Sequence, residues 1–166
     1  MNNWKDLLLE TKDNVKITFV CTGNIIRSAY AEYLAKKYFH PKNNVKIVFD
    51  SGACYHQNSY IHSLSKKLLI KEGYTEEQVT AHKPRWIENY IDDFNNTTIF
   101  IAMTNRHMRY LDETYPGKGF LLKEIVEGKK EEVLDPYYYP EQGEEIMKEL
   151  KELVLKFCKI IEELLY

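Results

Sequence analysis

The chain has 166 residues, and its 44% hydrophobic and 29% charged residues are typical of globular domains rather than disordered or fibrous chains. Its 23 basic and 25 acidic side chains leave a formal net charge of -2, so no global positive field exists that would attract nucleic acid or anionic lipid. Three cysteines argue against a disulfide framework, and no signal-peptide pattern or membrane-length apolar run occurs. We therefore expect a cytoplasmic monomer with no nucleic-acid or membrane partner.

The predicted elements alternate between strands and helices. Residues 1–14 are an N-terminal extension, either a short helix laid on the domain or a loose segment, and residues 15–166 are predicted to form a single domain. Runs of β-branched and aromatic residues predict strands, and apolar residues at helical spacing predict helices. The strands are predicted at 15–20, 45–49, 98–103 and 120–122. The helices are predicted at 29–39, with Ser28 as its N-cap, and at 61–71, 105–115 and 144–165.

The predicted strands are short, apolar on both faces and separated by helices, a pattern typical of a parallel sheet covered on both sides. We therefore predict an α/β fold with three αβα layers, in which a four-stranded parallel sheet is open and doubly wound. In such sheets, ligands bind beyond the carboxyl ends of the strands. This rule draws attention to the segments that follow residues 20, 49, 103 and 122.

The loop after the first strand, residues 21–28, carries the clearest chemical pattern. Cys21 ends a buried strand just before a predicted helix N-terminus, and Arg27 follows in the same loop. Free backbone N–H groups, the helix dipole and the guanidinium would all favour an ionised thiol. The same donors suit a phosphate or another tetrahedral oxyanion, so the loop predicts a nucleophile inside an anion cradle. The alternative is that Cys21 is a small buried hydrophobe and Arg27 is solvated.

The other loop residues are predicted to build this cradle. Gly23 would let the backbone turn so that its amides face inward, Asn24 would brace the loop, and the Ser28 hydroxyl is close enough in sequence to donate to the sulfur. The predicted phosphate-binding residues are Thr22, Gly23, Asn24, Ile25, Ile26, Arg27 and Ser28. The scattered His and Cys residues predict no metal site.

Three segments resemble the motifs of the low-molecular-weight protein-tyrosine phosphatases. The run Val20-Cys21-Thr22-Gly23-Asn24-Ile25-Ile26-Arg27-Ser28-Ala29-Tyr30-Ala31-Glu32 resembles their signature loop. The run Asp135-Pro136-Tyr137-Tyr138 resembles their Asp-Pro loop, and Asp50-Ser51-Gly52 resembles their Ser-Ala-Gly segment with one small residue missing. The match extends from about Lys16 onward in the family's order, and the family's fold is the one predicted above.

The resemblance implies hydrolysis of phosphotyrosine in two steps, with no metal or cofactor. Cys21 would attack phosphorus to form a phosphocysteine, while Arg27 and the loop amides stabilise the equatorial oxygens. Asp135 would protonate the departing phenolic oxygen and then activate the water that releases inorganic phosphate. The alternative for Asp135 is an ordinary turn aspartate before a proline. The implied substrate is a phosphotyrosyl protein or peptide.

Further residues receive roles from their position beside these motifs. Tyr55, Tyr137 and Tyr138 are predicted to line the entrance, where flat apolar rings suit an aryl phosphate. His82 resembles a family histidine that hydrogen-bonds the loop asparagine, here Asn24; the alternative is a solvated loop histidine.

The chain departs from the family pattern at several positions. Ile26 stands where a second cysteine often traps the oxidised nucleophile, and Cys54, which follows the second strand, is a hypothetical replacement for that thiol. Thr104 stands where the family usually has an aspartate that supports the site, and Ala29 replaces a common proline.

Three other functions remain as alternatives. Arsenate reductase shares the fold and the anion loop but needs a relay of further thiols, which residues 82–103 lack. Phosphoarginine phosphatases tend to carry a small polar residue at the position of Ile25, so this isoleucine favours phosphotyrosine. A non-catalytic phosphopeptide-binding module would have no physical reason to retain Cys21, Arg27 and Asp135.

Overall fold

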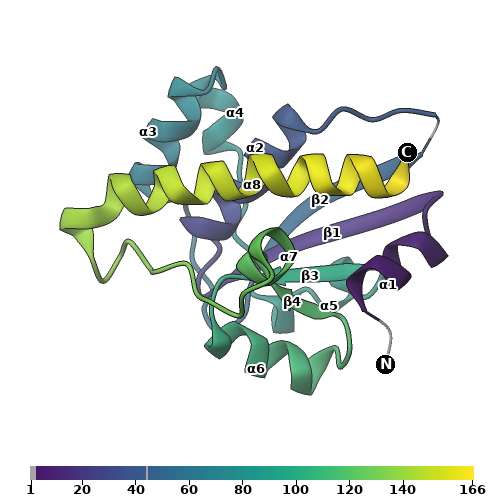
Figure 1. The fold of residues 1–166 in the computed structure, drawn as a ribbon. Helices are drawn as coiled ribbons and strands as arrows, with labels where there is room; N and C mark the ends of the chain where they lie inside the picture. Colours follow the sequence, from purple (N-terminus) through teal and green to yellow (C-terminus); the bar gives the residue numbers. More distant parts are fainter. Residues whose placement is uncertain (1–2, 44) are drawn as a thin grey trace.

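The computed structural model describes residues 3–43 and 45–166. Within them, four parallel strands form one sheet with the order β2-β1-β3-β4, and helices cover both of its faces (Figure 1). The strands are β1 (Asn14–Cys21), β2 (Lys46–Ala53), β3 (Ile99–Ala102) and β4 (Gly119–Leu121). The predicted three-layer α/β fold with an open parallel sheet is confirmed.

Each face of the sheet has its own hydrophobic core cluster. Phe19 of β1 belongs to the cluster under α2 (Arg27–Tyr38) and α8 (Gly143–Leu165), where it packs against Phe157. The next residue, Val20, belongs to the cluster under α5 (Ile91–Phe94) and α6 (Asn105–Thr114). Successive side chains of a strand point to opposite faces, so covering both faces requires the continuously apolar strands seen in the sequence.

The N-terminal extension is helical over α1 (Trp4–Glu10), which lies along the domain rather than away from it. Leu8 is fully buried in the first core cluster, and α1 contacts both α8 and β3. The described part of residues 1–14 therefore contains the short helix, while Asn14 already belongs to β1; residues 1 and 2 lie outside the described part.

Several short elements escaped the sequence analysis. These are α4 (Glu76–Thr80), α5, α7 (Leu122–Glu127) and the 3-10 helices at Ile87–Asn89 and Pro140–Gln142. The helix expected at 61–71 is present as α3 (Ser63–Lys71). Each missed element has six residues or fewer, which is too short to show a hydrophobic period. The expected strand at 120–122 ends one residue early because Leu122 begins α7.

The parallel register brings the ends of three strands to one edge of the sheet. Cys21, the last residue of β1, is the register partner of Ala53, the last residue of β2. Val20 is likewise the partner of Ala102, which ends β3. The loops that follow these strands therefore lie next to one another, as expected for the ligand-binding edge of such a sheet.

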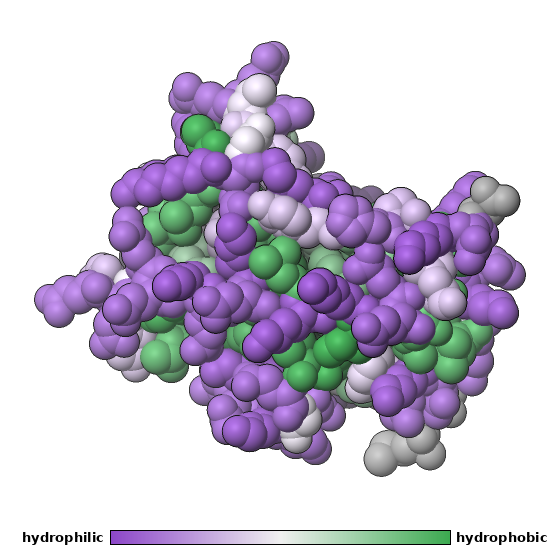
Figure 2. Space-filling model, turned by 45° about the horizontal axis from the view of Figure 1, so that its top comes forward, coloured by the Kyte–Doolittle hydropathy of each residue, from purple (hydrophilic) through white to green (hydrophobic). Residues whose placement is uncertain are grey.

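The face of the molecule seen in Figure 2 is mainly hydrophilic, with smaller hydrophobic patches between the polar side chains. Among the described residues, every helix is too short or too polar to cross a membrane.

Candidate active site

The loop between β1 and α2 wraps around the Cys21 sulfur. Asn24 takes the left-handed turn of this loop, with a φ of 58°. Gly23 was expected to supply the turn, but its φ lies outside the left-handed region; it lies against Asn58 instead, whose Nδ2 a Cβ at this position would meet. That nitrogen donates a 3.0 Å hydrogen bond to the Gly23 carbonyl, which ties the loop to the segment after β2.

Ser28 holds the sulfur through a hydrogen-bond relay. Its Oγ lies 3.0 Å from Sγ of Cys21, which is only 3% exposed. Because Nδ2 of Asn24 donates to the Ser28 oxygen at 2.9 Å, the serine's own hydrogen is available to the sulfur. The backbone N–H of Arg85 donates to Oδ1 of Asn24 at 3.1 Å and so fixes the orientation of this amide. The expected N-cap role of Ser28 is wrong, because α2 begins at Arg27 and Ser28 already lies inside the helix. The N-cap position belongs to Ile26, whose side chain makes no capping hydrogen bond.

The relay continues into the protein interior. Nδ2 of Asn24 also donates to Oγ of Ser51 at 2.8 Å, and the Ser51 hydroxyl donates to the buried carboxylate of Glu32. His82 supports the same asparagine from the other side, since its Nε2 lies 2.9 Å from the Asn24 carbonyl oxygen. Burial lowers the pKa of His82, although the bond to the carbonyl acts in the opposite direction. The structure thus places His82 against Asn24, at its backbone rather than its side chain.

Arg27 and Asp135 meet beside Cys21. The buried guanidinium of Arg27 donates from Nη1 to the Val133 carbonyl at 2.8 Å, and its Nη2 lies 3.3 Å from Oδ2 of Asp135. The aspartate accepts a 3.0 Å hydrogen bond from the backbone N–H of Tyr137, which orients its carboxylate. Two residues more than 100 positions apart in the sequence are brought together because both loops reach the same edge of the sheet.

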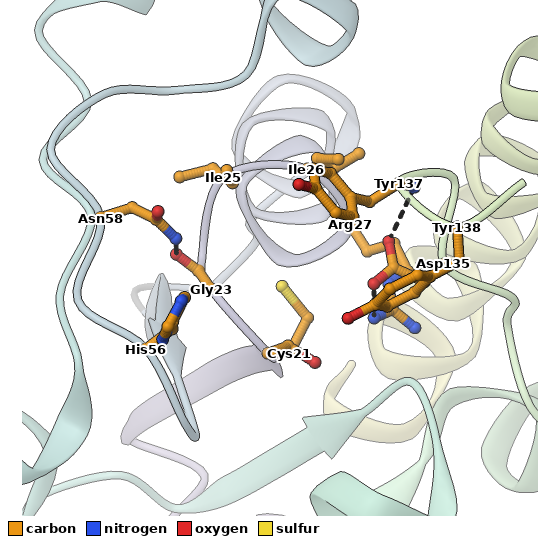
Figure 3. Close-up of a pocket in the computed structure, with 11 residues that line it drawn as sticks. Cys21, Gly23, Ile25, Ile26, Arg27, His56, Asn58, Asp135, Tyr137 and Tyr138 are labelled. Carbon is orange, nitrogen blue, oxygen red and sulfur yellow. Dashed lines mark hydrogen bonds and ion pairs between the residues drawn. The ribbon is translucent and has the colours of Figure 1, made fainter. Parts of the chain in front are cut away.

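These groups surround one cavity of about 290 Å³. Figure 3 shows the Cys21 sulfur pointing into a space that Gly23 and His56 border on one side and Asp135 and Tyr138 on the other. The lining residues are Cys21, Thr22, Gly23, Ile25, Ile26, Arg27, His56, Asn58, Asp135, Tyr137 and Tyr138. The rings of Tyr137 and Tyr138 are 64% and 67% exposed, so they stand at the entrance.

Tyr55 was expected at this entrance but does not line the cavity. Its hydroxyl donates to the Arg106 carbonyl, and its ring lies under the Arg106 guanidinium, 4.4 Å from the ring centroid. His56 and Asn58, from the same loop, line the cavity in its place. The rule that ligands bind at strand ends identified this loop, but which of its side chains face inward depends on the backbone path between residues 53 and 62.

Cys54 lies at the same sheet edge as Cys21, because its N–H donates to the Cys21 carbonyl at 2.8 Å. Its side chain belongs to the core cluster on the opposite face of the sheet from that of Cys21. Burial, together with the proximity of Cys21, raises the pKa of the Cys54 thiol well above its ordinary value. Both observations count against the hypothesis that Cys54 is a resolving thiol.

His107 is a neighbour of the site that the sequence analysis missed. It is 1% exposed at the start of α6, and its Nε2 lies 3.0 Å from Oγ1 of Thr22 in the loop after β1. Burial lowers its pKa to about 3, and the nearby guanidiniums of Arg27 and Arg106 act in the same direction. The only signal in the sequence was Thr104 after β3, at a position where an aspartate was expected. Its hydroxyl accepts a 3.3 Å hydrogen bond from the backbone N–H of His107.

Acid should therefore destabilise the fold through His107. Between its ordinary pKa of 6.5 and its folded value of about 3, the unfolded chain takes up a proton that the folded chain does not, so the free energy of unfolding falls as pH falls. His107→Gln should flatten this dependence by up to about 1.4 kcal/mol per pH unit. Urea denaturation from pH 6.5 to about pH 4 measures the slope, and His40→Gln, at an exposed position, is the matched control. An unchanged slope in His107→Gln would contradict this assignment.

Among the described residues, no group of three or more His, Cys, Asp or Glu side chains is placed to hold a metal ion.

Comparisons with known proteins agree on one family. A family model described as "Low molecular weight phosphotyrosine protein phosphatase" matches residues 16–164. A protein-arginine-phosphatase of Geobacillus stearothermophilus is 30% identical over 128 residues, covering 75% of this chain and 80% of the relative. A protein-arginine-phosphatase of Bacillus subtilis is 26% identical over 151 residues, covering 86% and 97%. The solution structure of a low molecular weight protein tyrosine phosphatase from Bacillus subtilis aligns with a TM-score of 0.71 at 25% identity, covering 90% and 98%.

Proposed function

The chain belongs to the low molecular weight phosphotyrosine protein phosphatase family, and on this premise we propose that it hydrolyses phosphorylated protein side chains through a phosphocysteine on Cys21. The observation that carries the proposal is the convergence of three groups on one cavity: the buried Cys21 thiol held by Ser28, the Arg27 guanidinium and the Asp135 carboxyl. Nothing in this arrangement requires a metal or a cofactor.

In the first step, the Cys21 sulfur forms a bond to phosphorus while the bond from phosphorus to the leaving group breaks. Arg27 and the loop N–H groups balance the charge on the transferring phosphoryl oxygens. Asp135 gives its proton to the leaving atom. In the second step, Asp135 takes a proton from water, the water oxygen bonds to phosphorus, and the sulfur–phosphorus bond breaks to release phosphate.

The relatives and the cavity support different leaving groups. Two of the similar proteins are named arginine phosphatases, so sequence similarity favours phosphoarginine over the phosphotyrosine expected from the sequence. The cavity supports phosphotyrosine, because Ile25 gives it an apolar wall with no acceptor for guanidinium N–H groups. Buried N–H groups without acceptors are costly, whereas an aryl ring has none. On geometry we place phosphotyrosine first, with phosphoarginine as the second candidate.

One peptide sequence carrying either phosphotyrosine or phosphoarginine tests the proposal. The expected result with metal-free protein in EDTA is release of phosphate from both peptides or from the phosphotyrosine peptide alone, with a higher kcat/KM for phosphotyrosine. A higher kcat/KM for phosphoarginine would reverse the order of the two candidates. If neither peptide releases phosphate, the proposed function is overturned, and an arsenate-plus-thioredoxin assay would then test for a reductase.

Replacing Ile25 by threonine should move specificity toward phosphoarginine. The substitution shortens the apolar wall and adds a hydroxyl that can accept from a guanidinium, so the ratio of kcat/KM for phosphoarginine to that for phosphotyrosine should rise by about 10-fold. Ile70→Thr, at an exposed position on α3, is the matched control and should leave the ratio unchanged. An unchanged ratio in Ile25→Thr would show that this wall does not select the leaving group.

A further inference from the structure

Two hydrogen bonds hold the imidazole of His107 between α6 and the phosphate-binding loop. The backbone N–H of Thr104 donates to Nδ1 of His107 at 3.2 Å, and the Thr104 hydroxyl in turn accepts from the backbone N–H of His107. On the far side of the ring, Nε2 lies 3.0 Å from Oγ1 of Thr22. Thr22 directly follows Cys21, so this contact joins the start of α6 to the residue next to the nucleophile.

The direction of these bonds follows from proton counting. A neutral imidazole carries one N–H, and the Nδ1 lone pair of His107 is occupied by the Thr104 N–H. The low pKa of this buried ring keeps it neutral at physiological pH. The remaining hydrogen is therefore on Nε2 and is donated to the Thr22 oxygen. The Thr22 hydroxyl acts as acceptor in this bond, and its own hydrogen is left for another partner.

Thr22 lines the catalytic cavity together with Cys21 and Arg27. Across residues 3–43 and 45–166, the Thr22 hydroxyl makes no hydrogen bond other than the one from His107. The arrangement parallels that of Ser28, where Asn24 donates to the serine oxygen and thereby directs the serine hydrogen at Cys21.

We propose that the Thr22 hydroxyl is a further catalytic donor, which binds a non-bridging oxygen of the transferring phosphoryl group, and that His107 is the positioning residue that directs its hydrogen into the cavity. This proposal rests on the proposed phosphatase function and adds a side-chain donor to the backbone cradle. An oriented hydroxyl contributes most where charge develops in the transition state, because it needs no reorganisation at that moment.

Substitutions at Thr22 separate the hydroxyl from the space that the side chain fills. Thr22→Val keeps the shape and removes the donor, and we expect it to lower kcat by about 10-fold and to weaken tungstate binding by a similar factor. Thr22→Ser keeps the hydroxyl and should restore most of both losses. Thr80→Val, at an exposed position at the end of α4, is the matched control and should change neither. Tungstate affinity is measured by calorimetry, which requires no turnover.

The role of His107 has its own readout. In ¹⁵N NMR spectra, the His107 ring should show a protonated Nε2 and an unprotonated Nδ1 in the wild type and in Thr22→Val. His107→Gln should lose less activity than His107→Leu, because an amide N–H can still donate to the Thr22 oxygen. If His107→Leu does not fold, the ring spectrum and Thr22→Val still test the proposal.

Three results would overturn the proposal: a proton on Nδ1 of His107, wild-type kcat and tungstate affinity in Thr22→Val, or no rescue by Thr22→Ser. The failure of the phosphatase function looks different. Wild-type protein that binds tungstate but hydrolyses no phosphorylated peptide would refute the function, while the tungstate affinities of the Thr22 variants would still test the donor. Wild-type protein that binds no tungstate would overturn both.

Discussion

Cys21→Ser should abolish turnover while the protein still binds oxyanions. The serine hydroxyl is a far weaker nucleophile than the thiol, so we expect kcat to fall by at least about 10⁴-fold. The donors of the cradle, including Arg27 and the loop N–H groups, do not depend on the sulfur. Tungstate or phosphate binding should therefore remain within a few-fold of wild type in a calorimetric titration.

Cys158→Ala serves as the matched control for this experiment. Cys158 is a buried residue of α8 in the first core cluster, and alanine removes its thiol without burying an unpaired hydroxyl. This variant should keep its kcat. Hydrolysis by Cys21→Ser at a rate near that of the wild type would refute the covalent mechanism, and loss of both turnover and tungstate binding would show that the substitution disrupts the cradle itself.

Asp135→Asn should lower kcat by about 10²–10⁴-fold, the usual contribution of a positioned general acid and base. Asparagine keeps the oxygen that accepts from the Tyr137 N–H, so the loop should retain its path. The loss should be larger for phenyl phosphate than for p-nitrophenyl phosphate, because the better leaving group needs less help from a proton. This dependence on the leaving group distinguishes a lost acid from a displaced loop.

The same substitution has a predicted effect on binding. Asp135 lies 3.3 Å from Arg27, so its negative charge competes with an oxyanion for the guanidinium. Removing the charge should leave tungstate affinity unchanged or higher. Glu141→Gln, an exposed carboxylate a few residues later, is the matched control and should change neither kcat nor affinity. An equal loss for both aryl phosphates in Asp135→Asn would argue against a role in protonation.

Local sequence pattern was sufficient for the architecture and for identifying the loop around Cys21. β1 was predictable from its run of β-branched and aromatic residues, which suits a strand buried on both faces. α2 was predictable from its helix-forming residues, with Tyr30, Leu34 and Tyr38 at helical spacing. The residues from Cys21 to Ser28 are consecutive in the sequence, so they could be assigned to one loop without knowledge of the rest of the fold. Short helices such as α4 and α7 carried too few residues for the same argument.

Contacts between distant segments could not be obtained in this way. Asp135 meets Arg27, and Asn58 meets Gly23, only because the parallel register brings separate loops to one edge of the sheet. Which loop residues face the cavity is decided by the backbone path, and this is why Tyr55 turns toward Arg106 while His56 lines the pocket.

The sequence by itself determined the α/β class and the parallel sheet, and it placed Cys21, the proposed nucleophile, in the loop after β1, because each of these depends on short-range order and on burial. Only the tertiary structure decided how the side chains of distant segments contact those residues. A hydrogen bond such as that from His107 to Thr22 joins side chains 85 positions apart, and its direction depends on a third residue, Thr104. Such contacts follow from the packing of α6 against the sheet, which no local pattern specifies.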